Sequence, residues 1–270
     1  MTEAMDIPGA KGMNHSSRFT LDWADSYTIH SYEVDTEGRV TLAALCRFMQ
    51  ESAWRHADHL EMGYSRFVEE NFAWILSRQR ICVDTYPRWG DSVTVRTRPT
   101  GTDRLFCYRD FILTDASEHI IGRAATMWFA IALATRAPQR TDAYFHVPLP
   151  DDGNLPPPVR LRKLPPPSTS DHKYTVQVAY GDLDTNHHVN NVRYIDWIVD
   201  SFADDFLKTH SLTELEINYL SEARYGDEIV VCGQDNDATT YHHRLVRSGD
   251  DVELIRARTY WHTTEVPELP

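Results

Sequence analysis

The hydrophobic pattern changes its period around a strongly polar segment, residues 182–191. Before this segment, apolar and polar side chains alternate over residues 174–180, which is typical of a strand with one buried face. After it, apolar side chains recur every three or four positions, which is typical of an amphipathic helix. We therefore predict a strand that ends near the polar segment and a helix from Asn190 to about Leu207. The segment itself carries two carboxylates, three carboxamides and two imidazoles beside the predicted helix N-terminus.

The rest of the chain contains one more helical pattern and several strand patterns. A second long helix is expected from Thr41 to about Leu60, and a short strand is expected before each helix. Segments rich in Val, Ile, Thr and aromatic residues predict strands at 73–84, 91–98, 105–114, 120–133, 212–220, 228–233, 239–247 and 252–263. A helix followed by consecutive strands with short turns favours an antiparallel sheet with the helix packed on one face.

The chain also contains two related copies of one unit. Residues 34–36 resemble 183–185, residues 88–95 resemble 224–231, and residues 123–128 resemble 256–261. The three matches occur in the same order, and their offsets shrink from 149 through 136 to 133. A duplication followed by small deletions in the second copy explains this order, so we interpret the chain as a tandem repeat.

Prolines mark the junction between the copies, because eight of the 14 lie between residues 148 and 167. Such a segment favours the extended polyproline II conformation and acts as a semi-rigid strap. We expect a disordered leader over 1–19, an N-terminal domain over 20–147, a Pro-rich linker over 148–171 and a C-terminal domain over 172–270.

Composition excludes several classes of function. The formal net charge of −13 argues against nucleic acid or an anionic membrane as a partner. No apolar run approaches the roughly 20 residues of a transmembrane helix, and the N-terminal segment resembles neither a secretory signal nor a transit peptide. The four scattered cysteines read as buried thiols, so a cytoplasmic location is expected; they are Cys46, Cys82, Cys107 and Cys232.

No metal or other cofactor is expected. The histidines at 56 and 59, 187 and 188, and 242 and 243 form pairs, but no third or fourth ligand follows at suitable spacing. A Gly-rich phosphate loop and a dinucleotide fingerprint are both missing from the sequence.

The polar segment carries a recognisable motif, D-x-N-x-H-V-N-N-x-x-Y. Its positions are Asp184, Asn186, His188, Val189, Asn190, Asn191 and Tyr194. With this motif, residues 20 to 265 resemble the acyl-acyl carrier protein thioesterases of fatty acid synthesis. The resemblance implies an α+β fold of two tandem hot-dog domains, each an antiparallel sheet wrapped around a long central helix. It also implies hydrolysis of fatty acyl-acyl carrier protein thioesters, which releases free fatty acid and terminates synthesis.

The candidate catalytic residues are Asp184, Asn186, His188 and Glu222. A thioester carbonyl needs a nucleophile, a proton acceptor and stabilisation of the oxyanion, and an imidazole or a carboxylate can be the general base. We favour water activated by the Glu222–His188 pair, with direct attack by Asp184 as the alternative. Many family members have a cysteine directly after the glutamate, but Ala223 stands here, which excludes a thiol mechanism at this site.

The duplication indicates a single active site per chain. Only Asp184 keeps its counterpart in the first copy, Asp35, whereas Glu37, Arg39 and Tyr86 stand where the second copy has Asn186, His188 and Glu222. The first unit is therefore expected to bind the acyl chain, as the family resemblance also implies. The candidate substrate-binding residues are Phe48, Met49, Trp54, Trp74, Leu76, Trp128, Asn190 and Asn191. Any one of the apolar side chains fits an ordinary core position equally well.

The expected partner is an acyl carrier protein with a fatty acyl chain. Such carriers are acidic, so docking on this acidic chain needs a local basic patch, either Arg136 and Arg140 or the linker residues Arg160, Arg162 and Lys163. Two alternatives remain open, an acyl-CoA thioesterase on the same fold and a non-catalytic acyl-thioester binding or sensing protein. The two fused units already form a pseudo-dimer, and the chain is compatible with either a monomer or a homodimer.

Overall fold

The computed structural model describes residues 22–141, 159–168 and 172–264. Within them the first copy contains β1 (Trp23–Thr28), α1 (Leu42–His59), α2 (Tyr64–Glu69), β2 (Phe72–Val83), β3 (Ser92–Thr102), β4 (Cys107–Thr114) and β5 (Ile120–Ala132). The second copy contains β6 (His172–Gln177), the 3₁₀ turn η2 (Tyr180–Asp182), α4 (Asn191–Asp200), α5 (Asp204–Thr209), β7 (His210–Tyr219), β8 (Glu228–Asp235), β9 (Thr240–Arg247) and β10 (Val252–Thr263). The predicted leader and most of the predicted linker lie outside the described residues.

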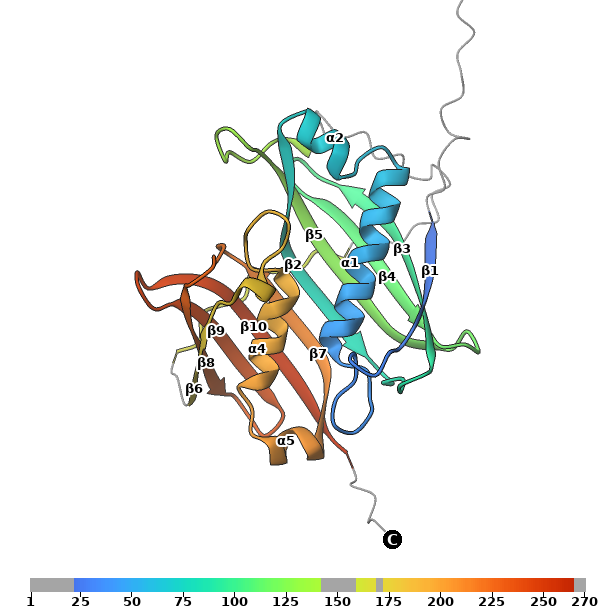
Figure 1. The fold of residues 1–270 in the computed structure, drawn as a ribbon, viewed down its shortest axis with the longest axis vertical. Helices are drawn as coiled ribbons and strands as arrows, with labels where there is room; N and C mark the ends of the chain where they lie inside the picture. The colour runs from blue at the N-terminus through green and yellow to red at the C-terminus, as the bar shows by residue number, and fades with distance from the viewer. Residues whose placement is uncertain (1–21, 142–158, 169–171, 265–270) are drawn as a thin grey trace, which may run out of the picture.

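All the strands of the described residues belong to one antiparallel sheet with the order β1-β3-β4-β5-β2-β7-β10-β9-β8-β6. Each copy contributes five strands in the same internal order, and the second strands of the two copies, β2 and β7, pair at the centre (Figure 1). This central pairing runs from Arg78 opposite Asn218 to Cys82 opposite Glu214. The matching strand order agrees with the duplication predicted from the sequence.

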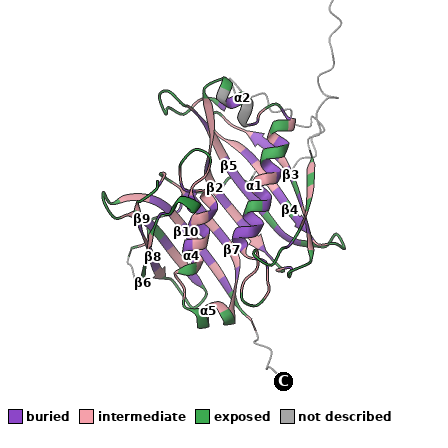
Figure 2. Ribbon diagram, in the orientation of Figure 1, coloured by how far each residue is buried: buried purple, intermediate pink, exposed green. Residues whose placement is uncertain are grey.

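Both long helices pack on the same face of the sheet (Figure 1). Thr41 caps α1 by accepting a hydrogen bond from the Ala44 amide at 3.1 Å, and the Arg47 guanidinium of α1 bonds Asp196 of α4 at 2.8 Å. The largest apolar cluster of the described residues continues through both copies and includes side chains of α1, α4 and the central strands. Figure 2 shows these buried positions on the helix faces and strands that contact one another.

The described part of the linker, residues 159–168, crosses the opposite face of the sheet. Arg78 of β2 donates to the Leu161 carbonyl at 2.6 Å, and the Leu164 amide donates to the side-chain oxygen of Asn218 at 2.6 Å. Arg256 of β10 donates to the Leu164 carbonyl at 3.1 Å. Because Arg78, Asn218 and Arg256 are neighbours in register, this strap crosses the junction between the two copies.

The prediction of one helix from Asn190 to Leu207 is wrong, because α4 ends at Asp200 and α5 begins at Asp204. The Ser201 hydroxyl donates to the Ile198 carbonyl at 2.7 Å and thereby takes an acceptor that a continuing helix would use. Ala203 is extended, and the acidic residues after it favour a new helix start. Helical spacing nevertheless persists across the break, since Phe202 stacks on Phe206 with 4.9 Å between ring centroids.

Other boundaries differ less. The strand predicted to reach Tyr180 ends at Gln177, because Asp182 accepts a hydrogen bond from the Ala179 amide at 2.8 Å and the chain turns into η2. The short helix α2 was not predicted, as its six residues are too few for a periodic signal. The remaining predicted strands agree with the structure within a few residues.

The core at the junction should be intolerant of truncation. Leu215 of β7 is fully buried and pairs with the equally buried Ile81 of β2. We expect Leu215→Ala to lower the free energy of unfolding by about 2–5 kcal/mol, because it leaves a cavity in a packed core. Ile112→Ala, on the partly exposed outer face of β4, should change it by about 0.5 kcal/mol. Equal effects in urea denaturation would show that the junction is not a structural centre.

Candidate active site

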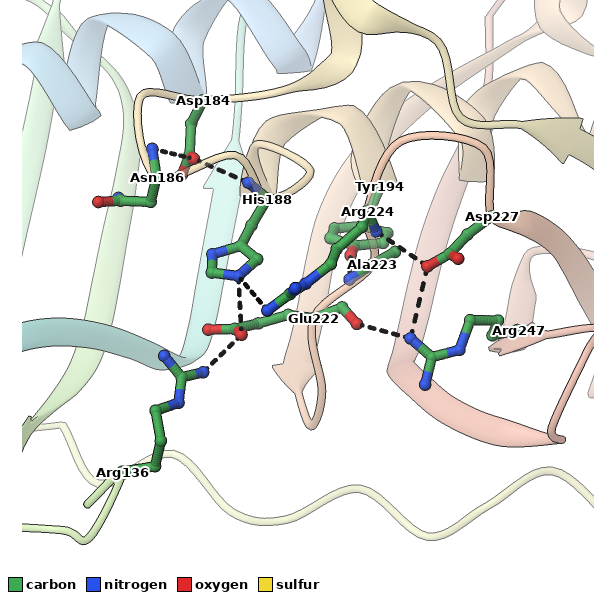
Figure 3. Close-up of polar contacts among 10 residues, drawn as sticks. All are labelled: Arg136, Asp184, Asn186, His188, Tyr194, Glu222, Ala223, Arg224, Asp227 and Arg247. Carbon is green, nitrogen blue, oxygen red and sulfur yellow. Dashed lines mark hydrogen bonds and ion pairs between the residues drawn. The ribbon is translucent and has the colours of Figure 1, made fainter. Parts of the chain in front are cut away.

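A tight loop before α4 presents the candidate site residues, and Asp184 closes it. The Asp184 amide donates to the His188 carbonyl at 2.8 Å. In return, one carboxylate oxygen of Asp184 accepts the amides of Asn186 at 2.8 Å and His188 at 3.2 Å (Figure 3). His187 adopts a left-handed conformation with φ 60° to complete the turn. Asp184 therefore fixes the backbone from which Asn186 and His188 project.

The first copy builds the same loop without the same chemistry. Asp35 accepts the amides of Glu37 and Arg39, both at 2.9 Å, and its own amide donates to the Arg39 carbonyl at 2.8 Å. Gly38, with φ 73°, stands at the position equivalent to His187. An aspartate at this position thus has a structural function in both copies.

His188 meets Glu222 at the centre of the site. The imidazole Nε2 lies 3.3 Å from a carboxylate oxygen of Glu222, and the side chains are 17% and 32% exposed. The backbone around Glu222 is held to the loop by its neighbour Ala223, whose amide donates to the Tyr194 hydroxyl at 3.2 Å and whose carbonyl accepts the Val189 amide at 2.9 Å. Two residues of the sequence motif, Val189 and Tyr194, therefore position the segment that carries Glu222.

Three arginines complete the polar network in Figure 3, and one of them, Arg247, donates to the backbone carbonyl of Glu222 at 3.2 Å. Arg136 lies in the loop after β5 of the first copy. Its guanidinium donates a 2.5 Å hydrogen bond to Glu222, at the same carboxylate oxygen that faces His188. Arg224 approaches His188 Nε2 at 3.4 Å. From the sequence, Arg136 is expected only in a basic docking patch, and no site function is expected for Arg224. Arg224 directly follows Ala223 in the chain, whereas Arg136 can be placed only once the pairing of β2 with β7 is known.

Asn186 lies on the exposed rim of the site. Its carboxamide extends away from the imidazole of His188 (Figure 3) and makes no hydrogen bond within the part of the chain that the structure describes. An open hollow of about 630 Å³ adjoins it, lined by Tyr180, Leu183, Asn186, His187, His188, Arg224 and Tyr225. The structure thus brings the four predicted catalytic residues into one region, with Asn186 and His188 facing the hollow.

The two asparagines that follow have visible structural functions. The Asn190 side chain caps α4 by accepting the Val192 amide at 3.0 Å, and the Asn191 carbonyl lies 3.4 Å from the Tyr219 hydroxyl, which donates to it. Capping by Asn190 is the ordinary use of this residue type at a helix start. Substrate contacts by either residue stay a prediction.

The six apolar candidates for acyl binding all lie in the first copy, and none of them lines the hollow. Phe48 and Met49 lie on the buried face of α1, and Leu76 pairs with Trp128 across β2 and β5. Trp74 stacks on Phe67 with 4.8 Å between ring centroids, while Trp54 is 43% exposed. The structure brings Leu76 and Trp128 together and places Trp54 at the surface. Their contact with an acyl chain stays a prediction.

The residues that the structure describes, 22–141, 159–168 and 172–264, offer neither a membrane-spanning helix nor a metal site. None of the helices in these ranges is long and apolar enough to span a bilayer. No group of three or more His, Cys, Asp or Glu side chains in the same ranges could hold a metal ion.

Comparisons with known proteins identify the fold and the family. Residues 20–146 match the family model described as the acyl-ACP thioesterase N-terminal domain, and residues 166–263 match its C-terminal domain. The chain is 28% identical to the chloroplastic palmitoyl-acyl carrier protein thioesterase of Gossypium hirsutum, over 89% of this chain and 64% of the relative. It is 27% identical to the chloroplastic oleoyl-acyl carrier protein thioesterase 1 of Arabidopsis thaliana, over 89% and 76%. The chain thus spans less than two thirds of the length of the Gossypium hirsutum relative.

Solved structures agree with this result. The acyl-ACP thioesterase of Bacteroides thetaiotaomicron superposes with a TM-score of 0.75 at 26% identity, over 89% of this chain and 98% of that one. The 12:0-ACP thioesterase of Umbellularia californica has the same fold, with a TM-score of 0.76 at 23% identity over 91% and 98%. The expected fold of two tandem hot-dog units is confirmed. Because the family models together cover most of its length, the chain belongs to the acyl-ACP thioesterase family.

Proposed function

We propose that this protein hydrolyses the thioester between a fatty acyl group and acyl carrier protein and so releases free fatty acid. Membership of the thioesterase family supports this activity. The single observation that carries it is the His188–Glu222 pair, 3.3 Å apart beside an open hollow. A carboxylate and an imidazole in contact are suited to take a proton from water and later return it.

The reaction needs one water molecule and no other reactant. The Glu222–His188 pair accepts a proton from water while the water oxygen bonds to the carbonyl carbon. The Asn186 carboxamide, which extends from the rim of the hollow, donates to the oxygen that becomes negative. The carbon–sulfur bond then breaks, and the thiolate of the carrier takes the proton.

The environment of His188 Nε2 is suited to proton movement. When Nε2 carries the proton it donates to Glu222 at 3.3 Å, and when it does not, it accepts from Arg224 at 3.4 Å. One nitrogen cannot do both at once, since a neutral imidazole nitrogen either donates or accepts. Transfer of the proton therefore exchanges one partner for the other without moving the ring.

Attack by Asp184 on the thioester is the less favoured route. Its carboxylate is engaged by two backbone amides, and Asp35 makes the equivalent bonds in a copy that lacks the other site residues. The turn alone explains why an aspartate stands there. We therefore assign Asp184 a positioning function in the proposed mechanism.

The cellular location, the oligomeric state and the docking surface for the carrier protein are also predictions. A cytoplasmic protein was expected from the sequence, whereas the plant relatives above are named chloroplastic. The choice between monomer and homodimer, and carrier docking through the strap residues Arg160, Arg162 and Lys163, stay predictions.

The proposed activity is tested by steady-state hydrolysis of acyl chains from C8 to C18, each presented on carrier protein and on CoA. A preference for the carrier protein that is lost in Asn186→Ala would support the proposal and would give the chain length. A preference for CoA would make the protein an acyl-CoA thioesterase. Tight acyl binding without turnover would indicate a sensor.

The catalytic pair should be essential for turnover. We expect His188→Ala and Glu222→Ala each to lower kcat by at least about 10²-fold, on the usual scale for a general base. Tyr86→Phe is the matched control, because Tyr86 occupies the position of Glu222 in the first copy and bonds the Leu212 carbonyl instead. Its kcat should stay near the wild-type value. Activity within a few-fold of wild type in either alanine variant would remove that residue from the mechanism.

Asp184 variants separate the two mechanisms. Asp184→Asn keeps a side-chain oxygen that can accept the two amides, so its kcat should fall by no more than about 10-fold. Asp184→Ala removes this acceptor, so His188 shifts and kcat should fall by about 10²-fold. Equal and near-complete loss in both variants would instead indicate that the carboxylate itself attacks the substrate.

The cysteines should not contribute to turnover. Burial raises the pKa of the Cys107 thiol to about 12, so it stays protonated and unreactive at neutral pH. We expect Cys107→Ser and Cys232→Ser to keep kcat within about 2-fold of wild type, since only the thiolate is a nucleophile. A large loss of turnover in a folded variant, checked by circular dichroism, would reveal a thiol function.

A further inference from the structure

The catalytic glutamate of the second copy has its closest ionic partner in the first copy. Glu222 offers one carboxylate oxygen both to His188 Nε2, at 3.3 Å, and to the Arg136 guanidinium, at 2.5 Å. The other ion pairs between the copies that the structure describes, Arg47 with Asp196 and Arg80 with Glu214, do not contact the candidate site. Among the described residues, Arg136 is therefore the point at which the first copy contacts the catalytic pair (Figure 3).

The loop that carries Arg136 is built to hold this position. Its amide donates to the Ala132 carbonyl at 2.8 Å, and the Gln139 amide donates to the Ala130 carbonyl at 2.8 Å, so both sides of the loop are bonded to the end of β5. Arg136 itself adopts φ 56°, a left-handed conformation that is uncommon for residues other than glycine. Such conformations persist where the surroundings fix them, and they cluster at functional positions.

Residues of the first copy at the equivalent positions likewise contact the second copy. Tyr86, the counterpart of Glu222, donates to the Leu212 carbonyl of the second copy at 2.6 Å. Arg39, the counterpart of His188, bonds Ser211 of the second copy at 3.0 Å. The position of Tyr86 and Glu222 therefore contacts the opposite unit in both copies, which ties this part of the site to both units.

We propose that Arg136 is a positioning residue for catalysis, which holds the Glu222 carboxylate against His188. A glutamate has three rotatable side-chain bonds, and half-exposed in water it would sample several directions. The ion pair selects the one in which a carboxylate oxygen faces Nε2. The pair is itself 53% and 32% exposed, so it adds little to stability and its effect falls on the orientation of Glu222. This inference rests on the proposed thioesterase function.

The rival function for Arg136 is docking of the acidic carrier protein, as considered from the sequence. A docking residue would act only on substrates that carry the partner protein or its phosphate-bearing arm. A positioning residue would act on every thioester. Substrates of different size therefore distinguish the two functions.

The test measures Arg136→Gln and Arg136→Lys on an acyl-carrier protein and on the N-acetylcysteamine thioester of the same acyl chain, which lacks both protein and phosphate. We expect Arg136→Gln to lower kcat by about 10- to 100-fold on both substrates, on the scale of a displaced catalytic group, with little change in KM. Arg136→Lys should recover part of the loss, because the cation remains. Added guanidinium ion should raise the kcat of Arg136→Gly.

Arg47→Gln is the matched control, since it removes an ion pair between the same two copies away from the site and should leave kcat unchanged. A rise in KM confined to the carrier substrate would overturn the proposal in favour of docking. Loss on both substrates without recovery by lysine or guanidinium would overturn it in favour of a purely structural function. A wild-type protein inactive on both substrates would overturn the proposed activity and this inference with it.

Discussion

The antiparallel pairing of β2 with β7 is the constraint on which the rest of the structure depends. It joins two five-stranded sheets into one, and it leaves α1 and α4 side by side on a single face. Because the two strands run in opposite directions, β7 leaves its pairing at Arg78 and points toward the start of β2, where β5 also ends. Glu222 follows β7 and Arg136 follows β5, so the pairing brings together residues that are 86 positions apart in the sequence. Arg80 and Glu214 bridge the same pairing with two hydrogen bonds, at 2.8 and 3.1 Å.

The two copies have used equivalent positions for different purposes. Both keep the aspartate that closes the loop before the helix, since the backbone needs the same two hydrogen bonds in each. The copies differ at the position of Arg39 in the first copy and His188 in the second. Arg39 of the first copy turns back to its own aspartate, with Nε 2.9 Å from the second carboxylate oxygen, whereas His188 of the second copy faces Glu222. A guanidinium that neutralises the loop carboxylate leaves no base there, which is the physical reason to expect one active site.

Local patterns predicted the local parts of this structure well. Helical and strand periods found α1 and most strands within a few residues, and the repeat predicted two equivalent units. The break after α4 was missed because Phe202 and Phe206 keep helical spacing although the Ser201 hydroxyl interrupts the backbone. At the site, the sequence motif gave His188 and its loop, since these residues are contiguous. The motif could not place Arg136 beside Glu222, because no local pattern determines which strands of the two units pair.

The strap on the sheet face opposite the helices also determines whether the two halves of the site stay together at low protein concentration. Two separate subunits that share a site lose it when they dissociate, and the loss grows as the protein becomes scarcer. A covalent connection makes the meeting of the two halves intramolecular, with an effective concentration set by the length and stiffness of the connector. Here the connector is bonded to the sheet by Leu161 and Leu164, directly across the junction. The half that carries His188 and Glu222 and the half that carries Arg136 therefore stay in a one-to-one ratio at any abundance of the protein.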